Sequence, residues 1–188
     1  TDPALLEFAL AGGRSAFAVN CSQCHGAGAA GSKGYPNLND DAWLWGGSLD
    51  AIHTTIRVGI RGGHADGRDA IMPAFLKDQL LTPAQTHDVA EHVLSLTQRG
   101  TDKAAAARGA TLFAEQCAPC HRPTGQGNVE FGAPNLTDAI WLYGGDKQAI
   151  VQTISYSRRG VMPAWEGRLD PVTIKQLAIY VHSLGGGE

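Results

Sequence analysis

The chain of 188 residues is 43% hydrophobic, so it is long and apolar enough to fold into one or two compact domains. Its 15 lysines and arginines against 18 aspartates and glutamates give a formal net charge of −3. Because a strongly basic surface is missing, this balance disfavours nucleic acid as a partner. No apolar run is long enough to cross a membrane, and no signal peptide is visible. Since the sequence opens at Thr1 without an initiator methionine, we expect a chain processed or excised from a longer one.

Apolar residues at helical spacing predict three helices in each half of the chain, and no strand pattern appears between them. In chain order, the expected helices cover residues 4–19, 49–60, 83–96, 103–116, 147–156 and 171–184. The third and the sixth open with Thr82-Pro83 and Asp170-Pro171, which is a capping residue followed by proline at the first helical position. Helices without strands predict an all-α fold.

A cysteine motif follows the first predicted helix and recurs after the fourth. Its copies are Cys21-Ser22-Gln23-Cys24-His25 and Cys117-Ala118-Pro119-Cys120-His121. Both have the C-x-x-C-H form of c-type haem attachment, in which two thiols bond the porphyrin and the histidine binds the iron. A zinc ribbon, a thioredoxin-type redox pair and disulfides are alternatives. The wide separation of the pairs disfavours a zinc ribbon, and the lack of a βαβ pattern disfavours a thioredoxin-type pair. The histidine after each pair disfavours disulfides. The sequence therefore predicts two covalently attached haem c groups.

The two halves of the chain are copies of one another. The segment Phe17–Cys24 matches Phe113–Cys120, and three shorter matches follow in the same order. These are Pro36-Asn37-Leu38 with Pro134-Asn135-Leu136, Trp43-Leu44-Trp45-Gly46-Gly47 with Trp141-Leu142-Tyr143-Gly144-Gly145, and Met72-Pro73-Ala74-Phe75 with Met162-Pro163-Ala164-Trp165. The polar stretch 97–102 is typical of a linker. We therefore predict two haem-binding domains, 1–100 and 101–188, as a tandem pair.

The only two methionines, Met72 and Met162, occupy equivalent positions before a proline. Methionine sulfur opposite histidine is a ligand pair of haem iron that raises the potential and suits electron transfer. The ordinary role of methionine is to fill a core, but its placement in both copies favours a ligand. The remaining histidines do not recur between the copies, so we interpret them as surface or packing residues: His53, His64, His87, His92 and His182.

These motifs resemble class I cytochrome c domains over nearly the whole chain. The resemblance implies that His25 and Met72 bind one iron, and that the Pro36 carbonyl accepts a hydrogen bond from His25. In the second copy, the same roles fall on His121, Met162 and Pro134.

The same resemblance implies that the first and last helices of each domain cross through a glycine and aromatic residues. The matching residues are Gly13, Phe17 and His92 in the first copy, and Gly109, Phe113 and Tyr180 in the second. Two further repeated pairs have roles near the haem. Arg61 and Arg159 either pair with haem propionates or remain solvated, and Trp43 and Trp141 are expected to pack against the haem edge.

The tryptophan-glycine and methionine-proline motifs in both halves, with a longer loop at 62–71 in the first, are similar to the diheme subunit of cbb-type haem–copper oxidases. This likeness implies a periplasmic domain that takes electrons from a soluble cytochrome c or the quinol-oxidising complex. It would pass them to the monohaem and catalytic subunits of an oxidase that reduces oxygen. That family also implies an N-terminal membrane anchor in the full-length protein.

Two alternatives remain. A free diheme carrier in the periplasm would use the same residues. A diheme peroxidase or a sulfur-oxidising dehydrogenase would need an open iron position, a histidine pair or a cysteine ligand. Since all four cysteines serve attachment and both halves offer a methionine, we predict no catalytic residue and no enzymatic activity of the chain on its own.

Overall fold

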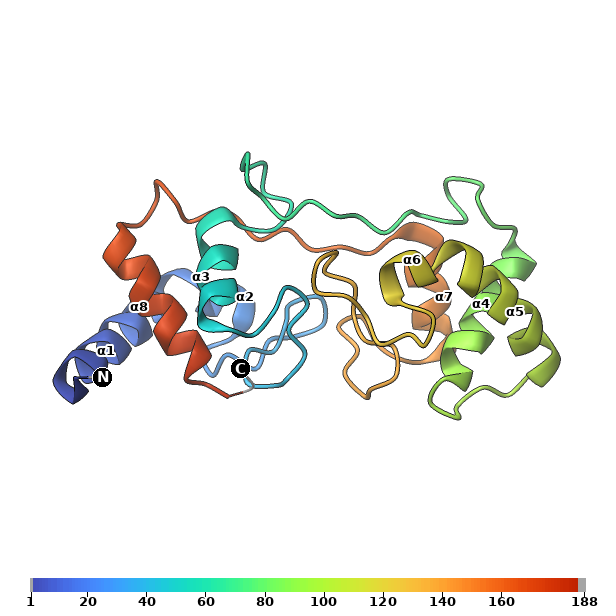
Figure 1. Ribbon diagram of the computed structural model, residues 1–188, viewed down its shortest axis with the longest axis horizontal. Helices are drawn as coiled ribbons and strands as arrows, with labels where there is room; N and C mark the ends of the chain where they lie inside the picture. Colours follow the sequence, from blue (N-terminus) through green and yellow to red (C-terminus); the bar gives the residue numbers. More distant parts are fainter. Residues whose placement is uncertain (1, 186–188) are drawn as a thin grey trace. The chain divides into compact units, whose positions relative to one another are not determined.

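The computed structural model describes residues 2–185, which form eight helices (Figure 1). They are α1 Pro3–Asn20, α2 Ser22–His25, α3 Leu49–Val58, α4 Pro83–Ser95, α5 Lys103–Gln116, α6 Ala118–His121, α7 Lys147–Tyr156 and α8 Pro171–His182. Within this part of the chain the backbone makes isolated bridges but no strand, so the predicted all-α class is confirmed. None of these helices is both long and apolar enough to cross a membrane.

The six longer helices match the predicted ones within two residues at each end. Capping explains their clear beginnings: Asp2, Ser48, Thr82, Asp102, Asp146 and Asp170 each accept a backbone N–H of the following turn. The single turns α2 and α6 were not predicted, because four residues are too few to show a helical period.

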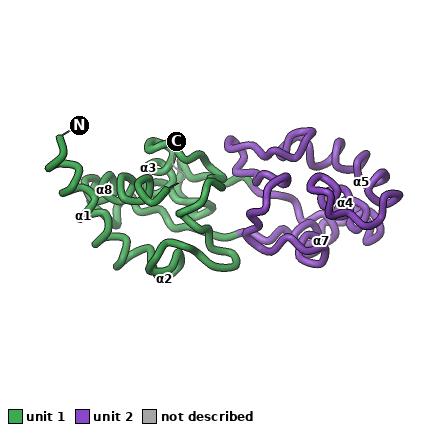
Figure 2. Tube along the Cα trace, turned by 90° about the horizontal axis from the view of Figure 1, so that it is seen from below, with its two compact units in different colours: residues 1–70, 160–188 green, residues 71–159 purple. Residues whose placement is uncertain are grey.

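The chain folds into two compact units that do not coincide with the two sequence repeats. Unit 1 comprises residues 1–70 and 160–188, and unit 2 comprises residues 71–159 (Figure 2). The predicted boundary near residue 100 therefore lies inside unit 2. Each repeat contributes its first two longer helices to one unit and its methionine segment with its last helix to the other.

This exchange of segments between the two sequence repeats is visible in how the helices pair. In unit 1 the first helix of the chain, α1, packs on the last, α8, and α8 also contacts α3. In unit 2, α4 packs on α5 and on α7. The short connection of residues 96–102 explains the α4–α5 pair, because consecutive helices with a short loop normally pack against each other.

Each unit has its own apolar core under the haem motif. In unit 1 the core contains Phe17, Ile52, Ile56 and residues of α8 such as Leu177, which is fully buried. In unit 2 the core contains Phe113, Ile150, Ile154 and residues of α4 such as Val89. Both cores are therefore built from both sequence repeats.

Candidate haem sites

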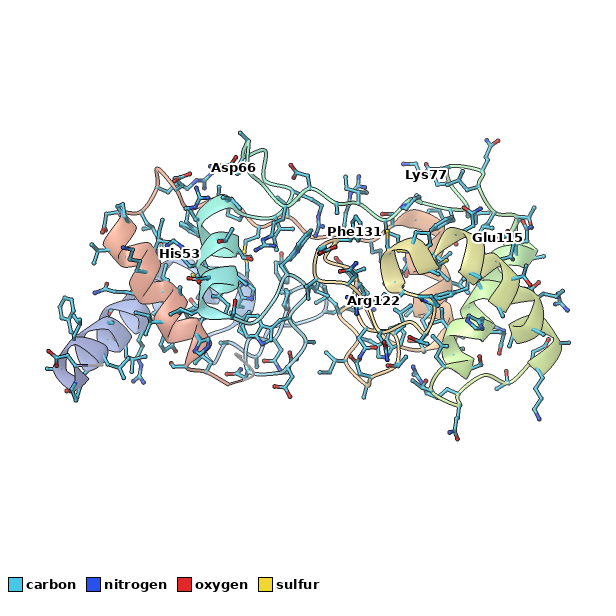
Figure 3. The ribbon with its side chains drawn as sticks, in the orientation of Figure 1. His53, Asp66, Lys77, Glu115, Arg122 and Phe131 are labelled. Carbon is cyan, nitrogen blue, oxygen red and sulfur yellow. The ribbon has the colours of Figure 1, made fainter. Side chains whose placement is uncertain are left out.

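The two cysteine motifs adopt the same local structure. Each forms a single helical turn after a longer helix, with Cys21 or Cys117 as the cap between the two helices. Two residues three apart on a helical turn lie on one face, so both thiols of a motif face the same side. The first unit ends the turn at Gly26 with φ 77°, and the second ends it at Arg122 with φ 64°, a left-handed conformation that is uncommon for arginine. Arg122 is labelled in Figure 3.

The four cysteines are free thiols, so no disulfide joins them. Each C-x-x-C-H motif lies within its own unit. Burial, reinforced by the neighbouring Cys24, raises the pKa of the Cys21 thiol to about 11. Burial and Cys120 raise the pKa of Cys117 to about 11 in the same way. This electrostatic setting does not produce the low-pKa thiolate of a thioredoxin-type redox pair.

Both motif histidines are oriented by the predicted proline carbonyls. Nδ1 of His25 donates to the Pro36 carbonyl at 3.0 Å, and Nδ1 of His121 donates to the Pro134 carbonyl at 3.1 Å. Since Nδ1 carries the proton, Nε2 is left with its lone pair, as a metal-binding imidazole requires. The donor set therefore fits the fifth ligand of a haem iron. Burial lowers the pKa of His121, while the proline contact raises it by a smaller amount.

A glycine lets each proline loop approach its histidine closely. Gly31 has φ 64°, and a side chain there would collide with the backbone of Tyr35 and Pro36. Gly127 has φ 79° and would collide with the backbone from Ala133 to Asn135. Their N–H groups donate to the carbonyls of His25 and His121, respectively. Glycine is required at both positions for the conformation and for the close approach.

Met162 lies in unit 1, beside the motif of the first repeat. Its backbone pairs in both directions with Ile60, with N–O distances of 2.9 Å each way. Gly59, at φ 71°, leaves room for the Met162 carbonyl. The partly buried Met162 side chain packs against the core that contains Phe17, and Cys21 packs against the same core.

Met72 lies in unit 2, beside the motif of the second repeat. The Ser157 hydroxyl donates to the Met72 carbonyl, and the Phe75 N–H donates to the Ile154 carbonyl at 3.0 Å. The partly buried Met72 side chain packs against the core that contains Phe113 and Cys117. The methionine segment of each repeat is thus held by the other repeat, at the end of α7 and the residue after it in unit 2, and at the residues after α3 in unit 1.

The compact units group the candidate ligands differently from the order of the repeats. His25 shares its unit with Met162, and His121 shares its unit with Met72. The physical reason is the α4–α5 pair, which retains the last helix of the first repeat, together with the methionine before it, in unit 2.

The predicted aromatic crossings are exchanged in the same way. Phe17 packs on Tyr180, with ring centroids 5.5 Å apart, and Phe113 packs on His92 at 5.0 Å. The glycines lie at the crossings as expected, with Gly13 against Gln176 of α8 and Gly109 against Asp88 of α4.

The repeated tryptophans and arginines near the methionines have different surroundings. Trp43 and Trp141 are partly buried against the cores of units 1 and 2. Arg61 donates from Nε to the Gly160 carbonyl at 2.8 Å and from Nη1 to the Ala70 carbonyl at 3.1 Å. Arg159 is exposed. Arg61 thus links the two segments at which the chain passes between the units.

Comparison with known proteins matches each sequence repeat to a cytochrome family. Residues 10–97 match the family described as "Cytochrome c", and residues 104–181 match "Cytochrome C oxidase, cbb3-type, subunit III". The chain is 56% identical to the cbb3-type cytochrome c oxidase subunit FixP of Bradyrhizobium sp. (strain ORS 278), over 100% of this chain and 65% of the relative. It is 52% identical to the subunit CcoP of Cereibacter sphaeroides, with the same coverage. The chain thus spans about 65% of the length of these relatives.

Two cytochrome c domains define the class: a tandem cytochrome c, a kind of protein that binds haem c covalently. Within that class, the chain belongs to the family of the FixP and CcoP subunits of cbb3-type cytochrome c oxidases.

Proposed function

We propose that the chain relays electrons through two covalently bound haems to the oxygen-reducing subunit of a cbb3-type oxidase. The observation that carries the proposal is the duplicated site: each unit combines a C-x-x-C-H turn, a proline carbonyl that orients the histidine and one methionine. Identity of more than half to FixP and CcoP, along the whole chain, supports an oxidase subunit over a free diheme carrier or a diheme enzyme.

The proposed ligand sets follow the compact units. In unit 1, Cys21 and Cys24 attach the haem, and His25 and Met162 bind its iron. In unit 2, the attachment residues are Cys117 and Cys120, and the ligands are His121 and Met72. The donor pair of imidazole and thioether is the one that raises the potential of a c-type haem.

Bound haem iron supplies a one-electron couple, and the protein residues keep the geometry constant between its two redox states. The hydrogen bonds to Pro36 and Pro134 fix the planes of the imidazole rings. The two backbone hydrogen bonds between Met162 and Ile60 hold the backbone from which the proposed thioether ligand extends. Since neither ligand needs to move, little rearrangement accompanies electron transfer, and the barrier remains low.

The proposed partners are the monohaem and catalytic oxidase subunits as acceptors, and a soluble cytochrome c or the quinol-oxidising complex as donor. The proposed location is the periplasmic side of a membrane, with the full-length protein anchored there. Reconstitution with the purified oxidase core should restore oxygen consumption driven by reduced cytochrome c. A chain that accepts electrons but never passes them to the core would be a free carrier instead.

The first experiment measures the near-red absorption of the oxidised protein against its covalent haem content. A methionine-to-iron charge-transfer band with the intensity of two haems is expected. A band for one haem, or none, would exclude the double histidine–methionine ligation.

A second experiment tests the exchanged pairing. Replacing Cys117 and Cys120 by serine leaves only the haem on Cys21 and Cys24. In that background Met162→Ala should remove the charge-transfer band and open the iron to carbon monoxide, whereas Met72→Ala, the matched control, should leave both unchanged. The reverse result would restore the pairing implied by the order of the repeats.

A further inference from the structure

In unit 1, an arginine lies over the second aromatic residue of the repeated tryptophan-glycine motif. The guanidinium of Arg68 is 5.2 Å from the ring centroid of Trp45, and its Nη2 is 3.4 Å from the Ala51 carbonyl at the start of α3. Arg68 belongs to the longer loop of the first repeat, in which Figure 3 labels Asp66. The second repeat is eight residues shorter in this region.

In unit 2, a different arginine occupies the equivalent place. Arg158, two residues after α7, lies 4.9 Å from the ring of Tyr143 and donates from Nη2 to the Ala149 carbonyl at 2.7 Å. Tyr143 and Ala149 are the repeat counterparts of Trp45 and Ala51. The two units therefore bring a guanidinium to the same place, in each case from the arginine that lies four residues before the methionine of the repeat.

The two arginines differ in whether their hydrogen-bonding capacity is used. Arg158 also donates to the Thr153 hydroxyl from Nε at 3.0 Å and from Nη2 at 2.7 Å, and Thr153 donates to Ala149. In unit 1 the Nε of Arg68 is buried without a partner, and so is the hydroxyl of Thr55, the counterpart of Thr153.

The nearby tryptophans show the same difference. Nε1 of Trp141 donates to the Asp138 carbonyl at 3.2 Å, whereas Nε1 of Trp43 is buried without a partner. The three buried side-chain atoms without a partner among residues 2–185, on Trp43, Thr55 and Arg68, thus all lie in unit 1. Buried donors without an acceptor are costly, and such a group in a folded protein usually has a partner that is not protein.

The chemistry of the missing acceptor follows from the charge of Arg68. None of the ion pairs among residues 2–185 includes Arg68. Burial lowers the pKa of its guanidinium, so the charged form is penalised where it lies. Arg68 therefore lacks both a hydrogen-bond acceptor and a negative charge. A planar carboxylate supplies both, because it accepts charge-assisted hydrogen bonds from guanidinium and removes the penalty of the unpaired charge.

We propose that Arg68 is a positioning residue for the haem attached at Cys21 and Cys24, whose propionate carboxylate accepts hydrogen bonds from Arg68 Nε and from Trp43 Nε1 or Thr55 Oγ1. This proposal rests on the proposed haem attachment and goes beyond it. In unit 2 the matching arginine is bound to α7 instead and makes no such bond through its Nε. The two haems therefore differ in propionate environment although their ligand sets are alike.

The test compares Arg68→Gln with Arg68→Lys and with the matched control Arg158→Gln, in the holoprotein. The reduction potential of each haem is titrated. In the variant without Cys117 and Cys120, only the first haem is attached, so its potential can be assigned. A propionate without its cation stabilises ferric iron more strongly, so Arg68→Gln should lower the potential of the first haem only. Arg68→Lys should restore most of it, and Arg158→Gln should leave both potentials unchanged.

Infrared redox difference spectra of the unaltered holoprotein, with haem labelled by ¹³C at the propionates, give a second readout that does not depend on how a variant folds. A shifted carboxylate band of an arginine-bound propionate is expected for one haem of the two, and Arg68→Gln should abolish it. If no shifted band appears, or if both haems give identical propionate bands, water satisfies Arg68 and the proposal is wrong. The proposed ligation is judged separately, by haem content and the charge-transfer band of the same samples.

Discussion

At the scale of single residues, Glu91 of α4 shows how a buried charge joins three parts of unit 2. Its side chain is 1% exposed, yet its carboxylate accepts a hydrogen bond from Lys147 Nζ at 2.6 Å. It also accepts the N–H groups of Thr101 and Asp102 at 2.9 and 3.1 Å. Glu91 therefore links α4 to α7 and to the connection that leads into α5.

These bonds predict how the stability of unit 2 depends on pH. The Lys147 contact, with the backbone N–H groups, lowers the pKa of Glu91 from 4.5 to about 2. Because the folded pKa lies below the unfolded one, this stabilisation is present above about pH 4.5 and is lost as the pH falls toward 2.

Glu91→Gln should therefore lower the free energy of unfolding by about 2 kcal/mol at pH 7, the typical contribution of hydrogen bonds to a charged group. The difference from the unaltered protein should shrink as the pH falls below 4.5. Thermal unfolding of both proteins from pH 7 to pH 3 checks this, and a difference independent of pH would mean that the carboxylate charge contributes nothing.

Sequence reasoning reached the cysteines, the histidines and the proline carbonyls, because these residues act within one short segment. It gave Arg61 and Arg159 as either propionate partners or solvated residues, because an alignment from the start of the repeats matches these two. Counting back from the methionines matches Arg68 with Arg158 instead, since each lies four residues before its methionine. The sequence does not decide between the two alignments, whereas the contacts of the arginines do.

At the scale of helices, the α1–α8 crossing depends on Gly13, and the adjacent Gly12 provides a matched control. A side chain at Gly13 would collide with the Gln176 backbone carbonyl and the Tyr180 Cβ. A side chain at the adjacent Gly12 would meet only the flexible end of Gln176, which can move aside.

Gly13→Ala should therefore destabilise unit 1 by about 2–3 kcal/mol, in the range of overpacking in a close contact. Gly12→Ala should change the stability by less than about 1 kcal/mol, because the better helix propensity of alanine offsets the displaced side chain. Denaturant unfolding followed by far-ultraviolet circular dichroism measures both. Equal losses in the two variants would show that the α1–α8 contact is not as close as described.

The helices themselves could be predicted nearly to the residue, because apolar periodicity and capping residues are local signals. Their partners could not. Phe17 meets Tyr180 and Phe113 meets His92, although the repeat pairs Phe17 with His92. Both alternatives bury the same surfaces, so composition and periodicity favour neither.

At the scale of the whole molecule, the exchange changes what the 97–102 connection does. In a simple tandem pair this segment would be the only link between two independent domains. Here it joins α4 to α5 inside unit 2, and the chain passes between the units at Ala70–Ile71 and at Arg159–Gly160.

This arrangement predicts the result of cutting the chain after Gln98, at an inserted protease site. The two fragments should remain associated as one particle with both haems, because α1 packs on α8 and α4 packs on α5 across the cut. Both methionine charge-transfer bands should survive, since each methionine is held by the segment of the other fragment. Size-exclusion chromatography with haem quantification checks this, and the uncut protein with the same insertion is the control. Separation under native conditions into two single-haem fragments, each with its own band, would instead mean that each repeat folds on itself and that the exchanged ligand pairs do not form.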